Sequence, residues 1–216
     1  MGTTYHNKPI VTDGLVFYVD AANKVSYPGS GADIDDLVGV NTGNLSSSPT
    51  FEDVNGGVLD LDGSDQIIFD NPYSMSGGSV SIWFKREGSG TAGMIGTYDG
   101  GNKRSPTIYF AGGNIGWEFG NLSGQNSGVT FPIGFENYVI TYDSSFNAVV
   151  YAGGVQIDSG TSTSIANFWD YFTIGKYGNY SSMYMGGKFG CVSIYNRVLS
   201  AQEVLQNYNA LKDRFI

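Results

Sequence analysis

Short runs of β-branched and aromatic residues recur along most of the chain, and Gly, Asn, Asp or Ser bound each of them. In the run 79–85 (SVSIWFK), one face of the strand carries Val80, Ile82 and Phe84, and the other carries Ser81, Trp83 and Lys85. A period of two, repeated about every ten residues, is typical of the antiparallel, half-buried strands of a β-sandwich. Nothing resembles alternating βαβ units. The predicted strands are 15–20, 66–69, 79–85, 107–110, 115–119, 138–142, 148–151, 171–174 and 188–195.

The connections between these runs are short. The segment 151–156 (YAGGVQ) predicts a hairpin, because Gly153 and Gly154 can adopt the positive φ of a primed turn. Residues 143–147 (DSSFN) predict a longer loop before the next strand.

No composition shift marks a boundary between domains. The Gly/Ser-rich stretches 86–93 and 120–128 predict loops within one continuous β pattern. We therefore expect a single domain over 12–216. An N-terminal arm, 1–11, precedes it and has few core-forming residues, so we expect the arm to be loose in the isolated domain.

One helix is predicted at the end of the chain, over about 200–212. Ser200 and Glu203 have the spacing of a capping box, and Leu199 stands where a hydrophobic staple begins. The apolar stripe expected to lie against the sandwich consists of Val204, Tyr208 and Leu211.

The net charge is −9 and it is concentrated at the front of the chain. Residues 1–70 hold eleven of the 20 Asp and Glu residues but only two Lys or Arg. This acidic segment argues against nucleic acid as a partner and suits a cation or a basic surface. No apolar run is long enough for a membrane span. Cys191 is the single cysteine, and the start of the chain does not read as a signal peptide, so we expect a protein made in a reducing cytosol.

The opening block 11–31 (VTDGLVFYVDAANKVSYPGSG) and the segment 59–69 (LDLDGSDQIIF) resemble jelly-roll domains of the concanavalin-A-like, laminin-G-like type. The ending 188–215 is similar to versions that tailed bacteriophages encode as virion proteins. The resemblance implies an all-β fold, a two-sheet antiparallel jelly-roll sandwich with one C-terminal helix. It also implies a non-enzymatic structural protein of the virion, on head or tail, that is assembled in the host cytoplasm and contacts other virion proteins or its own copies. The alternative is a carbohydrate-binding receptor adhesin whose partner is a host cell-surface glycan.

A glycoside hydrolase is the third hypothesis, because some relatives of this fold are glucanases that carry Glu-x-Asp-x-x-Glu on one strand. Such chemistry needs two carboxyl groups flanking one glycosidic bond. No two glutamates of this chain lie close in sequence, and the nearest echo of the motif, 60–65, has the shorter Asp side chains. We therefore expect no enzymatic activity and assign no catalytic residue.

The same acidic segment is a candidate calcium site. Strand alternation places Asp60 and Asp62 on one face, and a turn at Gly63 brings Asp65 near them. Calcium is the one cofactor that the sequence suggests. The alternative is that short acidic residues here favour turns and keep an edge soluble.

Tyrosines concentrate in the loop 176–185 (KYGNYSSMYM), which we expect to be exposed. Flat aromatic rings and amides suit a pyranose, but Tyr and Met also suit contacts with a protein partner. The candidate carbohydrate- or partner-binding residues are Tyr177, Asn179, Tyr180 and Tyr184, together with Trp117 and Tyr98 on the same sheet.

Overall fold

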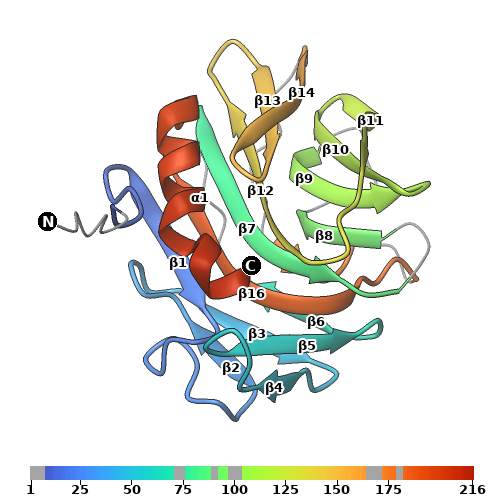
Figure 1. Cartoon of the computed structure of the whole chain (residues 1–216). Helices are drawn as coiled ribbons and strands as arrows, with labels where there is room; N and C mark the ends of the chain where they lie inside the picture. The colour runs from blue at the N-terminus through green and yellow to red at the C-terminus, as the bar shows by residue number, and fades with distance from the viewer. Residues whose placement is uncertain (1–7, 71–75, 89–91, 97–103, 164–171, 179–181) are drawn as a thin grey trace, which may run out of the picture.

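The structure is a computed structural model (Figure 1), and it describes residues 8–70, 76–88, 92–96, 104–163, 172–178 and 182–216. Two antiparallel sheets of eight strands face each other and one helix, α1 (Ala201–Phe215), lies on the outside of one of them. This confirms the predicted sandwich with a C-terminal helix. No helix among the described residues is long and apolar enough to cross a membrane.

The sheet that carries α1 is called sheet A. It runs in the order β14 (Val155–Thr161), β13 (Asn147–Ala152), β12 (Phe135–Tyr142), β7 (Gly78–Arg86), β16 (Gly186–Tyr195), β5 (Val58–Asp62) and β4 (Thr50–Glu52), and β1 (Leu15–Asp20) pairs with β16 beside this order.

The opposite sheet, sheet B, runs in the order β11 (Leu122–Thr130), β10 (Asn114–Gly120), β9 (Arg104–Ala111), β8 (Ala92–Gly96), β15 (Phe172–Ile174), β6 (Gln66–Phe69), β3 (Thr42–Ser46) and β2 (Asp33–Asp35). Strands far apart in sequence are therefore neighbours in both sheets.

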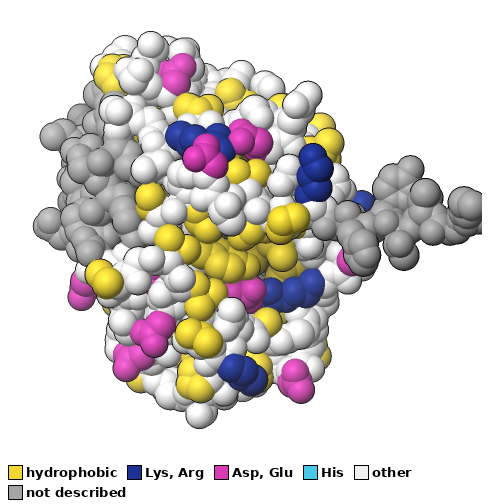
Figure 2. All heavy atoms as spheres, turned by 90° about the vertical axis from the view of Figure 1, so that its left-hand side faces the viewer, with side chains coloured by type: hydrophobic (Ala, Val, Ile, Leu, Met, Phe, Trp, Pro, Cys, Tyr) yellow, Lys and Arg dark blue, Asp and Glu magenta, His cyan; other side chains and the backbone are white. Residues whose placement is uncertain are grey.

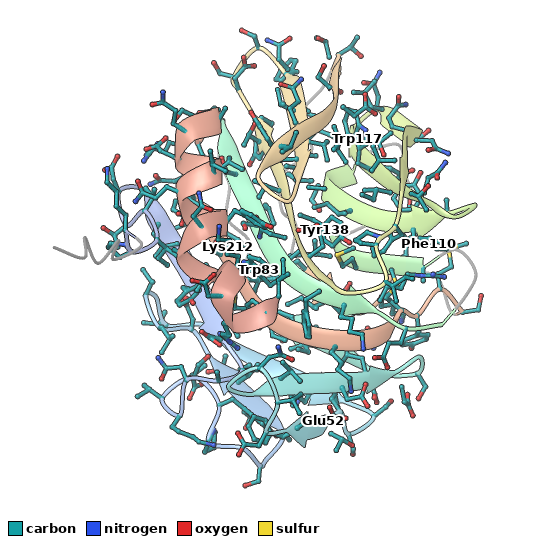
Figure 3. All side chains as sticks on the ribbon, in the orientation of Figure 1. Glu52, Trp83, Phe110, Trp117, Tyr138 and Lys212 are labelled. Atoms are coloured by element: carbon teal, nitrogen blue, oxygen red, sulfur yellow. The ribbon has the colours of Figure 1, made fainter. Side chains whose placement is uncertain are left out.

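Aromatic and β-branched side chains fill the space between the sheets. Phe17 from sheet A meets Phe69 edge-on, with 5.0 Å between ring centroids, and Phe69 stacks on Phe172 at 4.9 Å. Tyr138 lies in the middle of this layer (Figure 3) and is fully buried. Burial of this much apolar surface is the main force that holds the two sheets together.

Strand β7 departs from the expectation of a half-buried strand. Val80 and Phe84 point into the core as predicted, but residues 78–84 are buried on both faces. The reason is α1, which covers the outward-facing Trp83. The Trp83 ring stacks on Tyr208 at 5.6 Å and on Phe215 at 4.6 Å.

Helix α1 begins at the predicted cap and continues three residues beyond the predicted end at 212. The Ser200 hydroxyl accepts a hydrogen bond from the Glu203 backbone N–H, and the Glu203 carboxylate accepts one from the Ser200 N–H, so the capping box is confirmed. The last turn is held by Arg214, whose guanidinium donates to both carboxylate oxygens of Asp20 at 2.8 and 2.9 Å.

The described part of the predicted arm is docked on this helix. The Val11 N–H donates to the Asn207 side chain at 2.8 Å, and the Tyr195 hydroxyl donates to the Val11 carbonyl at 2.9 Å. The Gln206 amide donates to the Pro9 carbonyl at 2.8 Å. Figure 2 turns this side of the molecule toward the viewer, with hydrophobic side chains gathered across the middle and charged side chains above and below them.

The predicted connections are confirmed in one place and wrong in another. Gly153 and Gly154 form the β13–β14 hairpin with φ of 60° and 75°. The stretch 120–128, expected to be a loop, instead forms most of β11, an edge strand paired with β10. Its glycines are accommodated by irregularities in the register, which an edge strand tolerates.

Candidate functional site

A hollow with a volume of about 200 Å³ opens at the rim of the sandwich, and we call it the rim hollow. It lies where β5 and β7 end and β8 and β16 begin. Its polar lining consists of Asp62, Arg86, Glu87 and Tyr184. Glycines, Ala92 and Met185 form the rest, so little side-chain bulk fills the space.

Arg86 supplies the positive charge of the rim hollow. The side-chain alternation of β7 turns it toward the sheet interior, where its guanidinium lies over the Phe110 ring at 3.3 Å from the centroid. Burial lowers the pKa of Arg86, although an arginine remains charged in a protein. Within the described part of the chain, no carboxylate lies within ion-pair distance of this guanidinium.

Two carboxylates face the same space. Asp62 accepts hydrogen bonds from the hydroxyl and the backbone N–H of Ser64, at 2.7 and 2.8 Å, and these bonds lower the pKa of Asp62. Asp62 is therefore ionised at neutral pH and is held in one orientation. Glu87 pairs with Lys85 at 2.7 Å. Both residues present acceptors of known position to a ligand hydroxyl.

Tyr184 is the candidate tyrosine that the structure places at the rim hollow. The segment around it pairs with Lys176 through an isolated β-bridge, and the Lys176 ammonium lies 4.7 Å from the centre of the Tyr184 ring. These contacts fix a partly exposed aromatic ring beside the charged groups.

Tyr177, from the same loop, corrects the expectation of exposure. It is buried, its hydroxyl donates a hydrogen bond to Glu118, and its ring meets Tyr109 edge-on at 5.4 Å. A side chain at Gly93 would collide with the Tyr177 backbone, which shows how closely the loop packs on sheet B. Tyr177 therefore anchors the loop and does not offer its ring to a ligand.

Trp117 also points away from solvent. It is 1% exposed, because the alternation of β10 directs it into the core (Figure 3), and its indole N–H donates to Asp158 at 2.7 Å. It cannot stack on a sugar. Tyr98, Asn179 and Tyr180, the other candidates, lie outside the described residues.

The acidic residues proposed for calcium are spread over different contacts. Asp60 lies 3.6 Å from the Lys188 ammonium. Asp65 is buried, which raises its pKa, and its carboxylate accepts the Asp62 N–H at 2.9 Å across the turn at Gly63. Among the described residues, no three His, Cys, Asp or Glu side chains form a group that could hold a metal ion. Calcium binding stays a prediction.

A second hollow, of about 370 Å³, lies on the outer face of sheet A beside the last turn of α1, and we call it the helix-end hollow. Its centre is an ion pair between Lys188 and Glu52, 2.7 Å apart. Burial lowers the pKa of Lys188, but the hydrogen bond to Glu52 and the nearby carboxylates outweigh this effect, so the pKa lies above its usual value. The other lining residues are Val54, Asn55, Lys85, Gly134, Phe135 and Phe215.

Sequence reasoning missed Arg86, Glu87 and the whole helix-end hollow, whose residues come from distant strands. A weak signal was present. Lys85 is the last residue of the predicted strand 79–85, and Lys188 is the first residue of the predicted strand 188–195. Charged residues at the ends of otherwise apolar strands indicate that these ends of the sheet are exposed to solvent.

Comparison with protein families gives one match. A family model described as Concanavalin A-like lectin/glucanases superfamily, of the laminin-G type, matches residues 61–205. No curated protein matches the sequence.

Three solved structures illustrate the fold similarity. Domain 4 of AbnA, a GH43 extracellular arabinanase from Geobacillus stearothermophilus in complex with arabinotriose, is 20% identical with a TM-score of 0.70, over 90% of this chain and 98% of that chain. The receptor-binding domain of botulinum neurotoxin type G is 16% identical with a TM-score of 0.66, over 91% of this chain and 51% of that one. Trypanosoma rangeli sialidase in complex with sialic acid is 14% identical with a TM-score of 0.71, over 95% of this chain and 34% of that one.

The chain covers very different shares of these three matched structures. The chain spans about a third of the sialidase and half of the toxin fragment, but nearly all of the arabinanase domain. At these identities, the similarity shows the fold alone, and the fold includes both binding domains and glycosidases.

Proposed function

The chain belongs to the concanavalin A-like lectin/glucanase superfamily, and from this premise we propose that it is a non-catalytic carbohydrate-binding module whose sugar site is the rim hollow. A fold by itself does not imply a function, so the argument depends on the chemistry of the hollow.

The observation that carries the proposal is the joint presence of a ring, a cation and two carboxylates around a small cavity. The Tyr184 ring offers an apolar face to the C–H groups of a sugar, the Arg86 guanidinium donates hydrogen bonds, and Asp62 and Glu87 accept them. A volume of about 200 Å³ is below the range of pockets for drug-sized ligands, about 300–1,000 Å³, and suits a single small ring.

The similarity to the arabinanase domain supports this assignment, because that domain was solved with arabinotriose and the two chains match over nearly their full lengths. Arabinose polymers are therefore a reasonable probe.

We propose binding without cleavage because the rim hollow lacks an acid suited to protonate a glycosidic oxygen. Glycosidases need one carboxylic acid with a raised pKa beside a second carboxylate. Hydrogen bonds lower the pKa of Asp62, and Glu87 is paired with Lys85. Elsewhere, Glu118 accepts from Tyr177 and Gly124, and Glu203 belongs to the helix cap. Burial raises the pKa of Glu136, but Glu136 does not line the rim hollow.

The test is a glycan array probed with the purified protein, followed by calorimetry on the best ligand. Asp62→Asn and Tyr184→Ala should each weaken binding about tenfold, as expected for losing one oriented carboxylate or one stacking ring. Asp143→Asn is a matched control, because Asp143 also accepts turn hydrogen bonds, from Ser145 and Asn147, but lies outside the hollow. If no glycan binds to the wild-type protein, the proposed function is wrong.

As the place where this module works, we propose the surface of a bacteriophage particle. The support is the likeness of the ending 188–215 to virion proteins, and it comes from sequence alone. In that setting, the module would hold other virion proteins or a host glycan. Mass spectrometry of purified virions from a phage that encodes the chain is the direct test, and absence from the particle would contradict this location.

A further inference from the structure

The rim hollow and the helix-end hollow are lined by residues two positions apart on β16, and by Lys85 and Glu87 at the end of β7. On β16, Gly186 lines the rim hollow and Lys188 lines the helix-end hollow. On β5, Asp62 lines the rim hollow, and Asp60 lies 3.6 Å from Lys188. Two residues along a strand amount to about 7 Å and return to the same face of the sheet. The register confirms the alignment, since Gly186 is opposite Asp62 and Lys188 is opposite Asp60.

One ion pair separates the two hollows. Lys85 lines the helix-end hollow and Glu87 lines the rim hollow, and their side chains meet at 2.7 Å. Both side chains are partly exposed, at 32% and 42%. A ligand that extends out of one hollow over this ion pair enters the other.

The two lysines that line the helix-end hollow lie opposite each other in sheet A. Lys188 on β16 stands directly opposite Lys85 on β7, and like charges in that position destabilise a sheet. Glu52 and Glu87 neutralise the two ammonium groups. Two apolar residues at these positions would stabilise the strand pairing without this repulsion. The presence of charges instead indicates a functional role for them.

The chemistry of the helix-end hollow suits hydroxyl groups beside an apolar face. Phe135 and Phe215, with ring centroids 4.9 Å apart, form the apolar side, and Glu52 comes from β4 (Figure 3). Lys188 is sheltered, with 15% of its side chain exposed, so its donor group is already ordered. The positive charge of Lys188 is balanced by Glu52 and Asp60. The hollow therefore offers hydrogen-bond donors and acceptors to a neutral ligand and does not favour a charged one.

We propose that the two hollows are adjacent subsites of one site, and that the ligand is an oligosaccharide of at least two residues that crosses the Lys85–Glu87 ion pair. This inference rests on the proposed function, since it assumes that the rim hollow binds a sugar. The larger volume, about 370 Å³, gives the helix-end hollow room for more than one sugar ring.

The test compares ligands of increasing length. Arabino-, xylo- and laminari-oligosaccharides of one to five residues are titrated by calorimetry against the wild-type protein. The affinity of the recognised series should rise about tenfold or more between one residue and three, and then level off. Lys188→Met and Glu52→Gln should each reduce this gain with length, whereas Asp62→Asn should weaken binding at every length.

Lys212→Met is the matched control, because Lys212 lies on α1 (Figure 3) and lines neither hollow. It should leave every affinity unchanged. Melting curves of all variants check that they fold, and Glu52→Gln keeps the size of the side chain should Lys188→Met prove unstable.

The outcomes separate the two proposals. Binding that does not increase with length, or an increase that survives Glu52→Gln, would overturn the two-subsite inference and leave the carbohydrate-binding function intact. Failure of every series and of the glycan array would overturn both.

Discussion

The outer face of sheet A has two halves that differ in what covers them. Under α1, Trp83 stacks between Tyr208 and Phe215, and Cys191 is buried beside it. Beyond the last turn of α1, the same strands present charged residues: Lys85, two positions after Trp83 on β7, and Lys188 on β16. β7 thus passes from the buried core to an open, charged surface within two residues. The end of the helix decides where this change occurs.

The two halves also carry different shares of the stability. Buried aromatic stacking removes a large apolar area from water. Partly exposed ion pairs such as Lys85–Glu87 contribute about 0–1 kcal/mol each. The residues of the open half can consequently change with little loss of stability.

The largest expected effect is the difference in free energy of unfolding between substitutions at Trp83 and Lys85, two neighbouring outward positions of β7. Trp83→Ala should destabilise the fold by about 3–5 kcal/mol, because it removes a 2% exposed ring stacked on two others. Lys85→Ala, the control in the open half, should change the free energy of unfolding by less than about 1 kcal/mol. Urea denaturation measures both, and equal losses would contradict the division into two halves.

Asn207 tests how firmly the covered half holds the start of the domain. Its side chain accepts from the Val11 N–H and donates to the Tyr195 hydroxyl, so Asn207→Ala leaves buried polar groups unpaired. The expected loss is about 1–3 kcal/mol. Asn209→Ala, on the same helix, should have a smaller effect in the same denaturation experiment. If the two variants are equally stable, the docking of Val11 contributes little.

The helix cap should contribute less. Ser200→Ala removes the acceptor for the Glu203 N–H and should cost about 1 kcal/mol. Ser200→Thr keeps a hydroxyl and should retain most of this stability. Thermal melting of the three proteins is the measurement, and identical curves would show that the cap is dispensable once α1 is packed on the sheet.

A pH dependence follows from Glu203. Hydrogen bonds from Arg197 and from the Ser200 backbone lower its pKa to about 2 from an ordinary 4.5. A carboxylate with a lowered pKa stabilises the folded state above its unfolded pKa, so this contribution should be present above pH 4.5 and fade as the pH falls toward 2. It should stay within about 1 kcal/mol, since the pair is partly exposed. Glu203→Gln should reduce the pH dependence of unfolding in that range, and an unchanged profile would rule out this pair as its source.

Calcium is expected to have the smallest effect, because Asp60 pairs with Lys188 and Asp65 is bonded within its turn. Binding to the folded state alone would raise the melting temperature by mass action. Melting curves in millimolar calcium and in chelator, for the wild-type protein and Asp62→Asn, measure it. A rise in melting temperature that is lost in Asp62→Asn would place calcium at the rim hollow. Identical melting curves in calcium and in chelator would show that the protein does not bind calcium.

Local interactions explain what the sequence determined. The period of two in the strands, the positive φ of Gly153 and Gly154, and the cap at Ser200 each depend on a few neighbouring residues, and each was predicted correctly. The whole fold class followed, because strands of this spacing with one amphipathic helix have few ways to bury their apolar faces.

Only the tertiary structure decided which faces are covered. Trp117 and Tyr177 are residue types that often bind sugars, yet both are buried. Trp117 lies in the core between the sheets, and Tyr177 packs on sheet B with its hydroxyl bonded to Glu118. Conversely, Lys188 and Glu52, 136 positions apart in sequence, meet only because β16, β5 and β4 are neighbours in sheet A. Alternation along a strand shows that its two faces differ, but which face meets solvent depends on where α1 ends and which strands pair, and those are long-range contacts.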